Sequence, residues 1–109
     1  MTTITIQKTR TSEYSAIHVD GHAGFANYGK DIVCAAISVL VINMINSIET
    51  LTTEVINVMT NEKTGTIICE FNEHPSKEAV LLVDSMLLGL KEIEHQYGKK
   101  YLKLKIEEV

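Results

Sequence analysis

Two side chains that could together carry out acyl transfer lie near each other early in the chain. His22 belongs to the glycine-rich segment Gly21–Lys30, and Cys34 follows shortly after it. An imidazole can take the proton of a thiol, and the resulting thiolate attacks carbonyl carbon. The two residue types at this spacing therefore make a candidate nucleophile and general base.

The segment after the glycines determines where the cysteine lies. The apolar run from Ile32 to about Glu49 predicts a helix, and Asp31 before it is a good N-cap because its carboxylate can accept from unpaired amides. Cys34 then occupies the third helical position. Free amides and the helix dipole favour a thiolate there and could bind the oxyanion of an acyl-transfer intermediate.

Further polar residues surround the predicted pair. Ser38 lies one turn after Cys34 on the same helix face, where it could orient the pair or simply bond its own backbone. Asp31 and Asp20 are the nearest candidates for a third catalytic member, although Asp31 is already explained as a helix cap. Spacing leaves these alternatives open.

A structural interpretation competes with the catalytic one. A lone cysteine in an apolar helix is more often a buried packing residue. Cys69, between Ile67 and Phe71 on the inward face of a predicted strand, fits that description, with no helix start beside it. For Cys34 the neighbouring glycines and the helix-start position favour catalysis without deciding it.

Two other kinds of site can be considered. Gly24–Lys30 fits the phosphate-loop pattern G-x-x-x-x-G-K, which would make the protein a nucleotide-binding module, but Asp31 follows where a magnesium-binding hydroxyl belongs. A metal site from Cys34, Cys69 and the histidines lacks a C-x-x-C pair, and the spacing of His18 and His22 suits ligands on a helix rather than on a strand. We expect no metal and no cofactor.

Hydrophobic periodicity predicts the elements that position these residues. Strands are expected at residues 3–9, 14–19, 54–60, 66–72 and from Leu102 onward, with helices at residues 32–49 and from Pro75–Ser76 to Gly98. The first helix is apolar on most sides and is expected to be buried. The second should bury a stripe of apolar residues: Val80, Val83, Leu87, Leu90 and Tyr97. The order ββαββαβ predicts one two-layer α+β domain over residues 1–109, with a mainly antiparallel sheet.

Composition limits the class of protein. The chain has 109 residues, a formal net charge of −4 and 45% hydrophobic residues, which is typical of one small globular domain. The acidic balance and scattered lysines predict no nucleic-acid surface. The N-terminus does not resemble a signal peptide, and Ile32–Ile48 is short and interrupted for a membrane span. We therefore expect a cytoplasmic protein without a membrane partner and with two free thiols.

The motif as a whole resembles a known family. Gly21-His22-Ala23-Gly24, followed by the segment from Gly29 to Ser38 (GKDIVCAAIS), is similar to the signature of the ribosomal-processing cysteine protease Prp (YsxB-like) family. The resemblance covers the whole chain in length and element order.

This resemblance implies an activity and a substrate. Members are cytoplasmic homodimers that remove the N-terminal extension of ribosomal protein twenty-seven of the large subunit, cutting after hydrophobic aromatic residues. By position, His22 resembles the general base and Cys34 the nucleophile. Gly21, Gly24 and Gly29 resemble a substrate loop that orders around the peptide. A non-catalytic protein that associates with the ribosome is the alternative function in the same setting.

Overall fold

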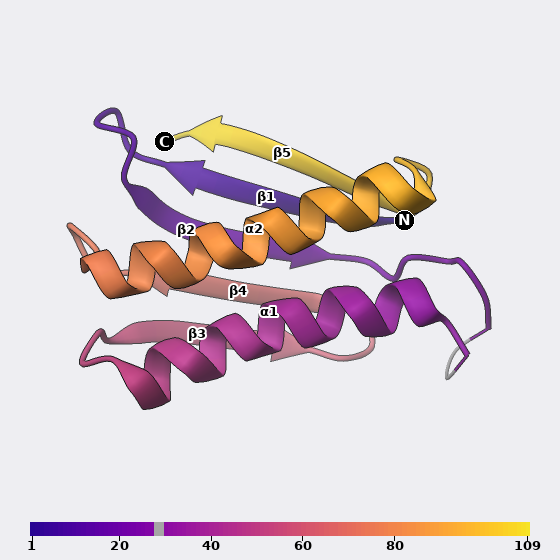
Figure 1. The fold of residues 1–109 in the computed structure, drawn as a ribbon, viewed down its shortest axis with the longest axis horizontal. Coiled ribbons are helices and arrows are strands. Elements are labelled where there is room, and N and C mark those ends of the chain that lie inside the picture. Colours follow the sequence, from indigo (N-terminus) through magenta and orange to yellow (C-terminus); the bar gives the residue numbers. More distant parts are fainter. Residues whose placement is uncertain (28–29) are drawn as a thin grey trace.

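The computed structural model describes residues 1–27 and 30–109 and contains the predicted order of elements. The elements are β1 (Thr2–Lys8), β2 (Tyr14–Asp20), α1 (Ile32–Leu51), β3 (Ile56–Asn61), β4 (Thr66–Phe71), α2 (Lys77–Tyr97) and β5 (Leu102–Glu108). Both helices lie on the same face of one sheet (Figure 1). The predicted two-layer α+β class is confirmed, and the element ends differ from the predicted ones by one or two residues.

The strands are arranged in the order β3-β4-β2-β1-β5. The β1–β2 and β3–β4 pairs are antiparallel hairpins, and β2 pairs antiparallel with β4. Only β5 pairs in parallel, with β1, because α2 returns the chain along the sheet before β5 begins. This topology leaves β3 and β5 as the edge strands.

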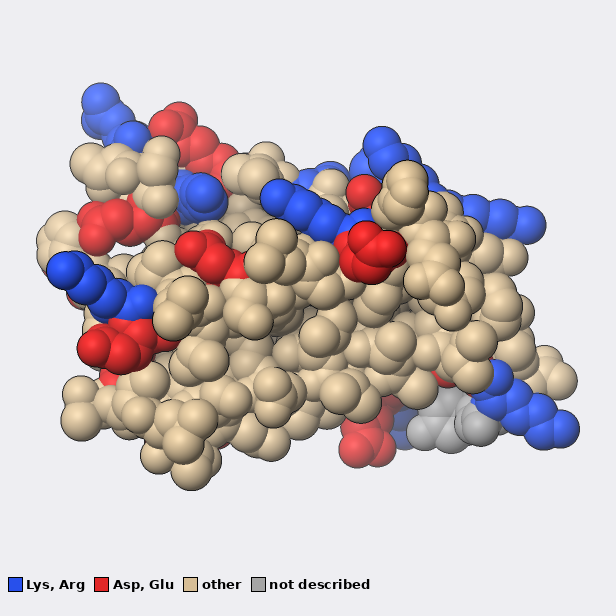
Figure 2. Space-filling view, viewed as in Figure 1, with Lys and Arg blue, Asp and Glu red and all other residues tan. Residues whose placement is uncertain are grey.

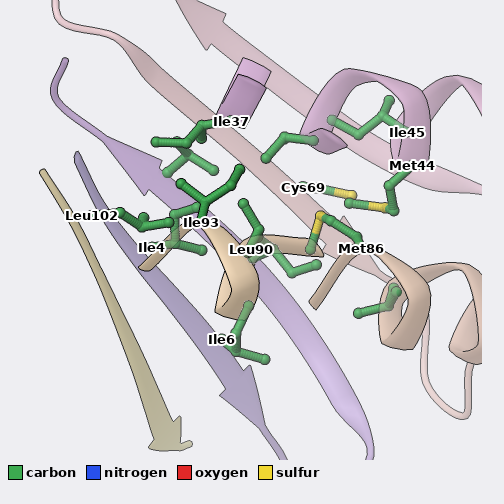
Figure 3. Packing of buried hydrophobic residues seen from close by; sticks show 14 of the residues in the cluster. Ile4, Ile6, Ile37, Met44, Ile45, Cys69, Met86, Leu90, Ile93 and Leu102 are labelled. Carbon is green, nitrogen blue, oxygen red and sulfur yellow. The ribbon is translucent and has the colours of Figure 1, made fainter. Parts of the chain in front are cut away.

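Alternation along the strands explains how the core forms between the two layers. Ile4 and Ile6 of β1 and Cys69 of β4 are at most 1% exposed, and they point toward the helices (Figure 3). Met44 of α1 and Leu90 of α2 meet them from the helix layer. Burying a side chain of this size stabilises the fold by about 1.5–3 kcal/mol.

The prediction that α1 is buried on most sides is wrong. Its inner face packs in the core, but Val39 is 67% exposed and Ile42 is 47% exposed. In a two-layer fold nothing covers the outer side of the helix layer, so a helix that is apolar all round keeps part of that surface in solvent. Among the described residues, α1 is also the one helix long and apolar enough to cross a membrane, although its inner face packs on the sheet.

The inward face of α2 also differs from the predicted stripe. Val83 and Leu90 are buried as expected, but Val80, Leu87 and Tyr97 are only partly buried. The other buried positions are Ala79, Met86 and Ile93, so the helix is rotated slightly about its axis relative to the prediction. The predicted ends are correct: the Ser76 side chain caps the first turn, and Gly98, with φ +99°, ends the helix.

Candidate active site

His22 and Cys34 meet where the loop after β2 returns to the start of α1. The Sγ atom of Cys34 lies 3.9 Å from Nδ1 of His22, within hydrogen-bonding range for sulfur. Cys34 is partly buried, whereas His22 is exposed. The structure thus brings together the two residues that the sequence proposes as base and nucleophile.

Asp31 caps α1 as predicted. Its Oδ1 atom accepts the backbone N–H of Cys34 at 2.9 Å, and its Oδ2 atom accepts the N–H of Phe25 at 2.9 Å. Burial raises the pKa of Asp31, but backbone hydrogen bonds from Cys34, Phe25, Ala26 and Val33 outweigh it and hold the pKa below its ordinary value of 3.8. The carboxylate therefore stays charged at neutral pH and joins the loop to the helix start.

This cap corrects one expectation about the helix start. The helix start is expected to supply free amides near Cys34 for an oxyanion, but the N–H of Cys34 itself is bound to the Asp31 carboxylate. The cap also brings a negative charge beside the cysteine, which offsets part of the helix-dipole effect on a thiolate. The backbone N–H of Cys34 can donate to an oxyanion only if its hydrogen bond to Asp31 breaks.

The other predicted site residues lie around the pair. Gly21 and Gly24 have φ of +87° and +73°, conformations that favour glycine, so the loop backbone depends on these residues. Gly29 lies outside the described residues. Ser38 is partly buried on the α1 wall beside Cys34, and Asp20 accepts a hydrogen bond from Thr66 at 3.0 Å.

Aromatic contacts of Phe25 attach the loop between β2 and α1 to the end of α2 and the segment before β5. The ring of Phe25 packs edge-on against Tyr97 at the end of α2 and against Tyr101 before β5, with ring centroids 5.6 Å and 5.2 Å apart. Together with the Asp31 carboxylate, these rings fix the middle of the loop to the body of the fold.

An apolar groove of about 530 Å³ begins at the His22–Cys34 pair. It runs along α1 past Val41, Ile42 and Ile45, and its opposite wall is formed by β3 and β4, including Val58 and Ile67. Polar and acidic residues complete its lining, among them Asn46, Glu49, Asn61 and Glu62. A thiol and an imidazole at the head of an apolar groove can hold an extended peptide and attack one of its carbonyl groups.

The sequence did not predict that the turn between β3 and β4 belongs to the site. Residues 61–65 connect the strands expected at 54–60 and 66–72, and Asn61, Glu62 and Gly65 line the groove beside His22. A glycine before a strand indicates a turn, but the contact spans more than forty residues of sequence. No local pattern could have indicated it.

Comparison with known proteins identifies the family of this chain. Residues 1–103 match the family described as cysteine protease Prp. The chain belongs to the cysteine protease Prp family.

Relatives within the Prp family are similar over nearly their whole length. Proteins named ribosomal processing cysteine protease Prp from Staphylococcus aureus and Bacillus subtilis are each 30% identical to this chain. The alignments cover 91% and 85% of this chain, and 93% and 87% of those proteins.

Solved structures of a Prp protease have the same fold. The S. aureus Prp protease in complex with a covalently linked product peptide superposes with a TM-score of 0.92 at 29% identity, covering 98% of this chain and 100% of that one. Its complex with a substrate peptide gives a TM-score of 0.87 at 28% identity, with the same coverage. The chain is a cysteine protease, as the sequence predicts.

The phosphate-loop alternative does not fit the Prp site. The amides of Phe25 and Cys34, which a phosphate would need, already donate to the Asp31 carboxylate. A carboxylate in that place repels phosphate. Over residues 1–27 and 30–109, no group of three or more His, Cys, Asp or Glu side chains could hold a metal ion.

Cys69 provides the contrast with Cys34 in this Prp-family chain. It is 1% exposed in the core, beside Met44 and Met86 (Figure 3). Burial raises the pKa of the Cys69 thiol to about 12, with a smaller contribution from the charges of Glu49 and Glu70. A thiol in this environment stays protonated and unreactive at neutral pH.

Proposed function

We propose that this protease removes the N-terminal extension of ribosomal protein twenty-seven of the large subunit, with Cys34 as nucleophile and His22 as general base. The observation that carries the proposal is the 3.9 Å approach of Cys34 Sγ to His22 Nδ1 at the head of the apolar groove. The names of the S. aureus and B. subtilis relatives support a ribosomal substrate.

The reaction follows from this arrangement. His22 takes the proton of the Cys34 thiol, and the thiolate adds to the scissile carbonyl to form a tetrahedral intermediate. The protonated His22 then donates its proton to the leaving amine as the carbon–nitrogen bond breaks, which leaves a thioester on Cys34. Water activated by His22 hydrolyses the thioester and restores the thiol. These steps use only groups of the chain, the peptide and water.

The groove suits an extended apolar peptide. From Cys34 to Glu49 it follows about 22 Å of α1, at about 1.5 Å of rise per residue. At about 3.3 Å per residue, an extended segment of six to seven residues fills that length. The apolar walls favour a substrate with large hydrophobic side chains, in keeping with cleavage after hydrophobic aromatic residues.

We also propose that the protein acts as a homodimer in the cytoplasm. The outer side of the helix layer carries the exposed apolar side chains Ile32 and Val39 of α1 and Leu81 and Leu88 of α2. Figure 2 views this side, where few charged side chains interrupt the centre of the surface. An exposed apolar area with few charges at its centre is typical of an interface between copies of one chain.

The deciding experiment is cleavage of the ribosomal protein carrying its N-terminal extension, measured by mass spectrometry of intact products. The wild-type enzyme should release the extension, and C34A should release none over the same period. C69A is the matched control, because it removes a thiol from the core and not from the site; it should keep most of the activity. Equal rates for C34A and C69A would contradict the proposed nucleophile.

A second assay tests the competing functions. Nucleotide with magnesium should leave the melting temperature unchanged, because the loop amides already bind Asp31. A rise of several degrees, without peptide cleavage, would favour a nucleotide-binding module. Binding to ribosomes with no cleavage by the wild-type chain would favour a non-catalytic ribosome-associated protein.

A further inference from the structure

The backbone beside His22 is held by the turn between β3 and β4. The Gly21 N–H donates to the carbonyl oxygen of Thr64 at 3.2 Å. On its other side, Gly21 accepts the Thr2 hydroxyl at 3.3 Å. The residue that precedes the general base is therefore clamped between the β3–β4 turn and the start of β1.

Gly65, the last residue of the same turn, lies close to the imidazole ring. Gly65 has φ +67°, and a Cβ atom added there would lie 2.7 Å from the carbonyl oxygen of Gly21 and 3.1 Å from Cε1 of His22. The first distance is shorter than real Cβ contacts allow, and its partner is backbone that cannot rotate away. Only a residue without a side chain lets the turn come this close.

A side-chain hydrogen bond fixes the turn to the strand that leads to His22. The β2–β4 ladder pairs Val19 with Ile67, and just beyond it the Thr66 hydroxyl donates to Asp20 at 3.0 Å. The Thr64 and Thr66 hydroxyls are themselves 2.7 Å apart. The turn is therefore attached to the end of β2 immediately before the loop begins.

From these contacts we infer that the β3–β4 turn positions His22 for its reaction with Cys34, and that Gly65 is a positioning residue of the protease. The turn supports the backbone of Gly21 and limits where the imidazole edge can lie, so that Nδ1 faces the thiol. This inference rests on the proposed role of His22 as general base.

G65A in the full chain tests the inference. The added methyl group must push Gly21 and the His22 ring away from the turn. We expect kcat for peptide cleavage to fall at least about tenfold with KM changed less than about threefold, since small misplacements of a reacting group cost large factors in rate. Iodoacetamide labelling of Cys34 at neutral pH should be slower in the same variant than in wild type. The rates measured for H22A show the effect of removing the imidazole completely, and those of G65A are compared with them.

G98A is the matched control. Gly98 also has positive φ, but a Cβ there meets nothing within 4 Å, and the residue lies at the end of α2, away from the groove. This variant carries backbone strain without displacing His22, so kcat and Cys34 labelling should stay within about twofold of wild type even if the melting temperature falls.

The outcomes separate this inference from the proposed function. If H22A is inactive while kcat of G65A stays within twofold of wild type, Gly65 does not position His22. The proposed role of His22 as general base would then still hold. Cleavage by H22A at the wild-type rate would instead overturn the proposed function. If G65A does not fold, T66V tests the inference instead. This variant removes the hydrogen bond from the Thr66 hydroxyl to Asp20 without adding a steric clash. Its kcat should fall several-fold, and an unchanged kcat would reject the inference.

Discussion

The Asp31 carboxylate accepts the backbone N–H of Cys34 at 2.9 Å, so the hydrogen bond that begins α1 also lies beside the proposed nucleophile. Its second oxygen holds the loop through the N–H of Phe25. One acidic side chain therefore stabilises the helix start and fixes the loop that carries His22.

We expect D31A to lower the free energy of unfolding by about 1 kcal/mol at pH 7, because an N-cap is lost. The lowered pKa of Asp31 means that the charged form stabilises the fold. Its contribution is present above the unfolded value of 3.8 and disappears as the pH falls through the lower folded value. Urea denaturation should show that the difference in free energy of unfolding between wild type and D31A becomes smaller below about pH 4.

D31N is the control for this prediction. Asparagine caps helices nearly as well as aspartate but does not titrate. Its stability at pH 7 should fall between that of D31A and that of wild type, because asparagine keeps an acceptor for the Cys34 N–H but has no second oxygen for the Phe25 N–H. The difference in free energy of unfolding between D31N and D31A should not change at low pH. A D31N variant as unstable as D31A would show that charge, and not capping, determines the effect.

The two thiols should differ sharply in reactivity. Iodoacetamide near pH 8 should label Cys34 in the folded protein and abolish cleavage, while Cys69, with burial and a pKa of about 12, stays unlabelled. Peptide mass spectrometry distinguishes the two sites. In denaturant both should react, and equal labelling of both thiols in the folded protein would contradict the assignment.

The α1 wall of the groove should determine substrate affinity. Ile42 lines the groove and is 47% exposed, so I42D adds a charge to the apolar wall without emptying the core. KM for the peptide should rise about tenfold or more, with a smaller change in kcat. V55D is a matched control, because Val55 is 67% exposed but does not line the groove. Equal effects of the two variants would indicate that the peptide lies elsewhere.

The outer face of the helix layer should carry the dimer. A double variant, V39E with L88K, places charges on two exposed apolar positions of α1 and α2. Sedimentation analysis should give a dimer dissociation constant at least about tenfold higher than that of wild type. Charges at the centre of an interface must lose their hydration when the dimer forms, and this weakens association. I106K changes a similarly exposed residue on the edge strand β5 and should leave the dimer intact. Loss of the dimer in I106K alone would place the interface at β5.

The sequence by itself determined the features that depend on neighbouring residues. Alternation and helical periodicity predict all seven elements, and an aspartate before an apolar run predicts both the cap and the helical position of Cys34. The motif around His22 and Cys34 indicates the family. These features follow from local geometry, in which a side chain acts on backbone within a few residues of itself.

Only the tertiary structure decided which distant surfaces meet. It placed β5 parallel to β1 and turned α2 so that Ala79 faces the core instead of Val80. It also brought Gly65 against His22 and formed the groove between α1 and β3. Such contacts depend on how whole layers pack, and the periodicity of one segment carries no information about the segment that it will touch.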